Sequence, residues 1–218
     1  MFAERGFEHH PGAAASVLSE LLSILADVPV ERAGTRLCGI SGLGELLEYR
    51  GVIGRIAANY LGAAARPVRS LLFEKSDTSN WALGWHQDRT IAVAERRDVD
   101  GFGPWTIKAG MVHVEPPTAV QAPMITLRTH LDPVDASNAP LLVAPGSHRL
   151  GRIPQADVAA VVQRCGVATC TAEAGDVWAH STPILHASDA AARPRHRRVL
   201  QIDYAADELP GGLRWLGI

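Results

Sequence analysis

Residues 167–180, VATCTAEAGDVWAH, indicate how this chain folds. Two short runs rich in β-forming residues, Val167–Thr171 and Val177–His180, lie on either side of the turn cluster Ala174-Gly175-Asp176. Runs of four or five such residues, bounded by glycine and small polar residues, are typical of strands and too short for helices. The stretch therefore predicts a β-rich domain.

Similar runs recur along the chain after the helix breaker Pro67. The further strands that we expect are 68–73, 90–94, 111–114, 124–131, 141–143 and 199–204. One helix, at 155–164, interrupts them. Many short strands separated by turns predict a mainly β sandwich or jelly-roll barrel with helices packed outside.

The part of the chain before Pro67 has a helical period instead. Apolar residues recur at helical spacing in 16–27 and 51–61, and 41–49 is expected to form a further short helix. With no linker or repeat in the chain, we expect one domain over 1–218. It would have a helical preface at 1–65 and a jelly-roll core at 66–212.

Composition excludes several classes of protein. The 218 residues include 21 Lys and Arg against 23 Asp and Glu, a net charge of −2, which argues against a nucleic-acid partner. No apolar stretch reaches the length of a membrane span, and the N-terminus does not resemble a signal peptide. Three cysteines predict no disulfide framework and fit a reducing cytoplasm. The oligomeric state stays open.

The candidate for chemistry is the segment Trp85-His-Gln-Asp88. His86 and Asp88 are two residues apart, so in a strand both side chains lie on one face. One imidazole and one carboxylate are two of the three ligands of a facial triad for Fe(II). The motif is short and occurs again as His130-Leu131-Asp132, so its context must decide.

A third ligand must come from a distant histidine. His186 lies 98 residues beyond Asp88, which leaves room for several barrel strands, and Arg197 follows 11 residues later. A guanidinium suits the far carboxylate of a 2-oxo acid that chelates the iron. His180, the competing ligand, has an alanine at that spacing. Arg198 is the alternative anchor, because only one of two adjacent arginines faces inward.

Several segments together resemble the phytanoyl-CoA dioxygenase family, from roughly residue 66 to 212. They are Phe73-Glu-Lys75, Asn80-Trp81, Trp85-His-Gln-Asp88, Gly101-Phe-Gly-Pro-Trp105, Pro145-Gly-Ser-His148, and His186-x-Ser188 with Arg197. That family comprises Fe(II)- and 2-oxoglutarate-dependent oxygenases with a double-stranded β-helix core. One departure is Asn138-Ala139, where the family often has Asn-Gly before the Pro-Gly-Ser-His turn.

The resemblance implies that His86, Asp88 and His186 bind iron and leave three positions for 2-oxoglutarate and O₂. Decarboxylation of 2-oxoglutarate to succinate and CO₂ would supply an oxidant that removes hydrogen from a substrate C–H bond. Hydroxylation of a small molecule is thus the expected reaction. Asp88 argues against halogenation, because a halide would need that carboxylate's position. Desaturation and cyclisation stay open.

The resemblance also implies roles around the cosubstrate. Arg197 and Ser188 would hold the C5 carboxylate of 2-oxoglutarate, while Gln87 and Trp105 would lie near it. Lys75 would line the pocket.

Three further residues are candidates for the substrate pocket: Trp85, Arg128 and His130. The strand 126–132 places Arg128 and His130 on one face with Asp132, and such a row of polar groups would be costly in an apolar core. Two other classes of protein remain possible. They are a cupin-like iron enzyme that does not use 2-oxoglutarate and a non-catalytic jelly-roll binding protein.

Overall fold

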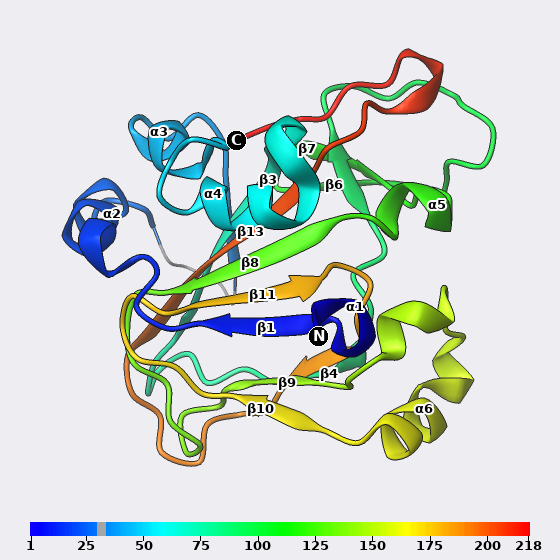
Figure 1. Ribbon diagram of the computed structural model, residues 1–218. Helices are drawn as coiled ribbons and strands as arrows, with labels where there is room; N and C mark the ends of the chain where they lie inside the picture. The colour runs from blue at the N-terminus through cyan, green and yellow to red at the C-terminus, as the bar shows by residue number, and fades with distance from the viewer. Residues whose placement is uncertain (30–33) are drawn as a thin grey trace.

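The computed structural model describes residues 1–29 and 34–218 (Figure 1). Its largest sheet has six antiparallel strands in the order β1-β11-β8-β13-β3-β2. Their bounds are Phe7–His10 (β1), Val177–Ser181 (β11), Ile125–His130 (β8), Arg197–Ala205 (β13), Arg66–Lys75 (β3) and Gly34–Leu37 (β2). Strand β13 is central and pairs with β8 on one side and β3 on the other.

A second sheet, of four strands, has the order β10-β9-β12-β4. These are Ala168–Cys170 (β10), Leu141–Val143 (β9), His186–Ser188 (β12) and Leu83–His86 (β4). A small third sheet contains β5 (Ile91–Val93), β7 (Met111–Val114) and β6 (Trp105–Lys108). The mainly β, jelly-roll fold expected from the sequence is confirmed.

The helices are short. They are Phe2–Arg5 (α1), Leu18–Ile24 (α2), Leu43–Leu47 (α3), Gly54–Leu61 (α4), Thr118–Gln121 (α5) and Val158–Cys165 (α6). Helices α2 to α4 lie against one side of the six-stranded sheet, and α6 lies at the far end of the molecule, beside the four-stranded sheet (Figure 1). Within residues 1–29 and 34–218, no helix has both the length and the apolarity of a membrane span.

The two faces of the six-stranded sheet differ in chemistry. Leu127, Leu200 and Tyr204 lie on the outer face and join the largest hydrophobic cluster with residues of α2 to α4. The residues that alternate with them point inward, toward the four-stranded sheet, and most are polar. They include Thr126, Arg128 and His130 on β8 and Arg197, Gln201 and Asp203 on β13. This polar inner face forms one wall of the candidate site.

Residues 1–65 are not only helical, as the sequence led us to expect. Strands β1 and β2 come from this part of the chain and form the two edges of the six-stranded sheet. Each has only four residues, too few to show a period of two against the helical pattern around it. Strands β4, β6 and β12, of three or four residues each, were missed as well.

Candidate metal centre

Pairing of β4 with β12 brings two distant histidines together. His86 and His186 are register partners in this antiparallel pair, and their ring centroids are 4.3 Å apart. Asp88 follows just beyond the end of β4. Each of the three residues offers one ligand atom, and these atoms all lie within 4.8 Å of one another. Residues separated by 98 positions in the sequence thus converge on one point.

Backbone carbonyls orient both imidazoles. Nδ1 of His86 lies 2.8 Å from the carbonyl oxygen of Gly84, and Nδ1 of His186 lies 3.0 Å from that of Ile184. A ring that donates its Nδ1–H to a carbonyl keeps the Nε2 lone pair free for a metal. Burial, together with the neighbouring His86, lowers the pKa of His186 to about 3, so its ring is neutral near pH 7.

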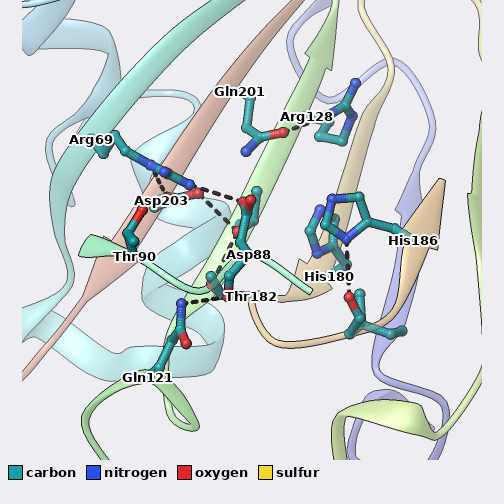
Figure 2. Close-up of polar contacts among 12 residues, drawn as sticks. Arg69, Asp88, Thr90, Gln121, Arg128, His180, Thr182, His186, Gln201 and Asp203 are labelled. Carbon is teal, nitrogen blue, oxygen red and sulfur yellow. Dashed lines mark hydrogen bonds and ion pairs between the residues drawn. The ribbon is translucent and has the colours of Figure 1, made fainter. Parts of the chain in front are cut away.

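Asp88 is held by a buried arginine. Arg69 donates from Nη2 to Oδ2 of Asp88 at 2.9 Å and from Nε to Asp203, so it bridges two carboxylates (Figure 2). Burial opposes ionisation of Asp88, but the charge of Arg69 outweighs it and holds the pKa of this carboxyl below its usual range. Gln121 donates to the backbone carbonyl of Asp88 at 2.7 Å. The second carboxylate oxygen, Oδ1, is therefore the one available to a cation.

The donor set fits Fe(II). Two neutral imidazoles and one carboxylate are the ligands of the facial triad, which leaves half of an octahedral sphere free. The ring of His180 lies near that of His186, tilted by 40° and with 5.6 Å between ring centroids. Its Nδ1 faces the Ser181 carbonyl, and it does not join the ligand cluster. Across the described parts of the chain, no fourth His, Cys, Asp or Glu does so.

Arg197 and Lys75 lie side by side on the inner face as register partners of β13 and β3. Arg197 is 1% exposed and donates from Nη1 to the carbonyl of Ala139. Lys75, which is fully buried, donates to Oγ of Ser188 at 2.9 Å and to the carbonyl of Asp189. Ala139, where the family often has glycine, has a φ of 52°, a left-handed conformation that glycine adopts more readily.

Buried polar atoms without a partner gather in the same region. Among residues 1–29 and 34–218, Nε and Nη2 of Arg197, Nε of Arg128 and both ring nitrogens of His130 make no hydrogen bond. Burial and the nearby Arg128 lower the pKa of Arg197 to about 9, and burial lowers that of Arg128 to about 10. Unpaired buried cations are costly, and a carboxylate would supply both the missing acceptors and the missing negative charge.

Arg198, the alternative anchor, points elsewhere. Its Nε and Nη2 atoms each donate to the Asp132 carboxylate at 2.9 Å, and its side chain is 27% exposed. Because this side chain already has a bidentate partner, Arg197 is the better candidate for binding a carboxylate.

Three other predicted site residues lie outside the cluster. The Gln87 amide binds backbone groups of Gly151, Pro183 and Ile153 at 2.7–2.9 Å, which fixes the loops behind the site. Trp85 packs in a small hydrophobic cluster beside α6. Trp105 packs in the cluster around the third sheet, with Arg96 5.6 Å from its ring centroid. Trp85 and Trp105 thus lie in hydrophobic clusters, whereas Gln87 holds neighbouring loops by hydrogen bonds and lines a cavity beside His86 and Asp88.

The sequence reasoning missed Arg69 and Asp203. Arg69 follows Val68 in β3, Asp203 lies between Ile202 and Tyr204 in β13, and both are buried. Charged residues are seldom fully buried unless they are paired, so two opposite charges inside two apolar strands were the signal available.

Solved structures share this fold. AviO1 from Streptomyces viridochromogenes Tue57 is 22% identical, covers 96% of this chain and 92% of its own, and has a TM-score of 0.60. HygX from Streptomyces hygroscopicus, solved with nickel, 2-oxoglutarate and hygromycin B, is 14% identical with a TM-score of 0.63, covering 94% and 84%. EctD from S. alaskensis, solved with 2-oxoglutarate and 5-hydroxyectoine, is 16% identical with a TM-score of 0.61, covering 100% and 77%.

No curated protein is similar enough in sequence to count as a match. The sequence profile of the family described as phytanoyl-CoA dioxygenase (PhyH), however, matches residues 52–199, more than half of the chain. That range contains both histidines and the aspartate of the cluster. The chain belongs to the phytanoyl-CoA dioxygenase family, whose oxygenases use Fe(II), 2-oxoglutarate and O₂.

Proposed function

We propose that His86, Asp88 and His186 bind Fe(II), that Arg197 binds the C5 carboxylate of 2-oxoglutarate, and that this enzyme hydroxylates a C–H bond of a small molecule. The observation that carries the proposal is the convergence of three ligand atoms within 4.8 Å of one another, with no fourth His, Cys, Asp or Glu among the described residues. Three such ligands would leave open positions on an octahedral Fe(II). Iron and 2-oxoglutarate supply the oxidative chemistry when bound, and the protein positions them and the substrate.

The residues around the cluster have separate tasks in this proposal. Arg69 holds Asp88 as an ionised carboxylate with one oxygen free, and the carbonyls of Gly84 and Ile184 keep both Nε2 atoms available. Arg197 offers two donors, Nε and Nη2, that have no partner in the described part of the chain and lie in the geometry that binds a carboxylate in two places. Lys75 adds a second positive charge beside Ser188 when it is protonated.

The HygX and EctD structures were solved with small polar molecules, hygromycin B and 5-hydroxyectoine. We propose by likeness that this enzyme also acts on a small polar molecule. Asp88 supports hydroxylation over halogenation, because a carboxylate takes the position that a halide would need. A chain with balanced charge and no basic excess supports a small-molecule substrate over a nucleic acid.

The test is an anaerobic titration of the protein with Fe(II) and 2-oxoglutarate, followed by succinate assays with O₂. The wild type should develop the absorption band of the iron–2-oxoglutarate complex, and succinate should form, faster once a substrate is found. In His186→Ala both signals should be lost, because the site loses a ligand. His196→Ala, an exposed histidine, is the matched control and should behave as wild type.

Two outcomes would overturn the proposal. Iron binding without any spectral response to 2-oxoglutarate would indicate a cupin-like enzyme that uses another cosubstrate. No iron binding in the wild type, or equal iron binding in His186→Ala, would indicate a non-catalytic binding protein or a metal site elsewhere.

A further inference from the structure

A cavity of about 540 Å³ borders the metal cluster. His86 and Asp88 form part of its wall. Four positively charged residues from separate segments also line it: Arg36 on β2, Arg69 on β3, Arg89 after β4, and Lys108 on β6. Asp88 is the one acidic residue in its lining among the described residues. The wall next to the metal site thus has a clear excess of positive charge.

Of these four, only Arg69 has carboxylate partners among the described residues, namely Asp88 and Asp203. Arg89 donates to the carbonyl of Ile153 at 2.8 Å, and Lys108 donates to Oγ1 of Thr90 at 3.0 Å. Both of these acceptors are neutral. Within residues 1–29 and 34–218, no carboxylate therefore pairs with the positive charge of Arg89 or of Lys108.

Arg36 is the least satisfied of the four. Its Nε is buried and makes no hydrogen bond to any described residue. The position is fixed by β2, where Arg36 is the register partner of Leu71 on β3. Gly34, two residues before it, allows close packing of this edge strand, because a Cβ there would lie 2.8 Å from the Phe73 ring. The fold thus holds at the cavity wall a guanidinium whose Nε has no partner within residues 1–29 and 34–218.

The positive groups also repel one another. Burial and then the charge of Arg69 lower the pKa of Arg36, and burial followed by Arg36 and Arg69 lowers that of Lys108. Asp88 is the group that acts in the opposite direction on both. Placing like charges together without a counter-ion is unfavourable, and a bound anion would remove that cost.

A second cavity, of about 680 Å³, shares Gly34, Arg36 and Lys108 with the first. The rest of its wall includes Ile107, whose side chain is 75% exposed, so this space opens outward. Arg36 and Lys108 therefore lie between an inner space beside the metal ligands and an outer space toward solvent. A molecule reaching from one space to the other would pass between these two side chains.

We propose that the substrate of this enzyme carries an anionic group, a carboxylate or a phosphate ester, which Arg36 and Lys108 bind while Arg89 contributes a further charge. The anion then fixes the rest of the molecule beside His86 and Asp88. This inference rests on the proposed function, since it takes those two residues as metal ligands. Arg36 lies before the range 52–199 matched by the family, so this contact belongs to the chain's own N-terminal part.

The test is calorimetric titration of the protein with inorganic phosphate and, separately, with acetate, at constant ionic strength set by potassium chloride. The protein is loaded with Ni(II) and 2-oxoglutarate, so that the region of Arg197 is already filled and no turnover occurs. A parallel series uses the metal-free protein. The wild type should bind at least one probe saturably, and the stronger probe tells a phosphate from a carboxylate substrate.

Arg36→Gln and Lys108→Gln should each weaken binding of that probe by about tenfold or more, because each removes a charge-assisted hydrogen bond. Arg164→Gln, an exposed arginine on α6 away from both cavities, is the matched control and should leave the affinity unchanged. Arg36→Lys keeps the charge and should restore part of the affinity.

No saturable binding of either probe by the wild type would overturn the inference. Equal affinities in wild type, Arg36→Gln and Lys108→Gln would do the same, as would an equal loss in Arg164→Gln. The metal-free series separates this result from a failure of the proposed function. If Ni(II) and 2-oxoglutarate do not bind but Arg36→Gln still weakens phosphate binding, the anion site stands and the metal site is wrong.

Discussion

The outer and inner faces of the six-stranded sheet are built from the same strands but differ in polarity and in function. On β8, Leu127 faces outward and packs under the helices, while its neighbours Thr126 and Arg128 face inward. The outer side chains are closely packed and apolar. The inner face keeps two buried arginines, Arg128 and Arg197, and Nε of each has no hydrogen-bond partner among the described residues. Stability should therefore come mainly from the outer face and binding from the inner one.

This separation explains why buried charges are tolerated. Arg128 and Arg197 are each at most 5% exposed. They lie on the inner face, beside the metal ligands, and not in the main hydrophobic cluster. Their cost falls on the protein without ligands and is reduced when anionic ligands bind. We therefore expect a substitution on the outer face to change stability but not ligand binding. A substitution on the inner face should change ligand binding without lowering stability.

Arg197→Ala should have the largest effect in this comparison. Loss of a buried, charge-assisted bidentate pair should weaken 2-oxoglutarate binding by about 2–5 kcal/mol, which is tens- to thousands-fold in affinity. Thermal stability without ligand should be kept or raised, because an unpaired buried charge is removed. Titration of 2-oxoglutarate into the Fe(II)-loaded protein under anaerobic conditions measures this. The matched variant Arg198→Ala should lose much less affinity, and the reverse order would reassign the anchor.

Leu127→Ala tests the outer face. Leu127 is completely buried, so the cavity left by this truncation should lower the free energy of unfolding by about 2–5 kcal/mol. Affinity for Fe(II) and 2-oxoglutarate, measured on folded protein at low temperature, should stay within about twofold. Urea denaturation gives the stability, with Val167→Ala, a half-exposed side chain, as control. A large loss of 2-oxoglutarate affinity would show that the two faces are not independent.

Lys75 links stability to pH. Burial, and then the charge of Arg197, lowers the pKa of Lys75 to about 7, whereas an unfolded lysine titrates near 10.4. Between these values the unfolded chain holds a proton that the folded chain lacks. This residue therefore makes the free energy of unfolding rise with pH from about 7 to 10, by at most about 1.4 kcal/mol per pH unit. Below pH 7 Lys75 is protonated in both states, and the full cost of burying its charge lowers the free energy of unfolding.

Lys75→Met should remove that contribution. Urea denaturation of both proteins between pH 6.5 and 9.5 measures it, and the difference between the two slopes isolates Lys75 from the other titrating groups. The variant should gain most in relative stability at the acid end of this range. Parallel curves for the two proteins would mean that Lys75 keeps its proton in the folded state.

The sequence predicted what depends on residue type and long-range pattern. His86, Asp88 and His186 were chosen by spacing and chemistry, and the structure brings their ligand atoms together. What the sequence did not predict depends on contacts between strands. The ion pairs of Arg69 with Asp88 and Asp203 need the registers of β3 and β13, and no local pattern sets these. Short strands such as β1 escaped detection because four residues define no period.

Trp105 was placed near the cosubstrate on the family pattern alone, whereas its ring packs in the cluster around the third sheet. Trp105→Phe keeps most of that packing and should give the smallest effect, less than about 1.5 kcal/mol in the free energy of unfolding. The affinity for 2-oxoglutarate should change by less than about twofold, because the ring lies in a different cluster from Arg197. Urea denaturation measures the free energy of unfolding and anaerobic titration measures the affinity for 2-oxoglutarate, each on this variant and on Trp85→Phe. A loss of affinity as large as that of Arg197→Ala would place the Trp105 indole at the cosubstrate and extend the functional face to the third sheet.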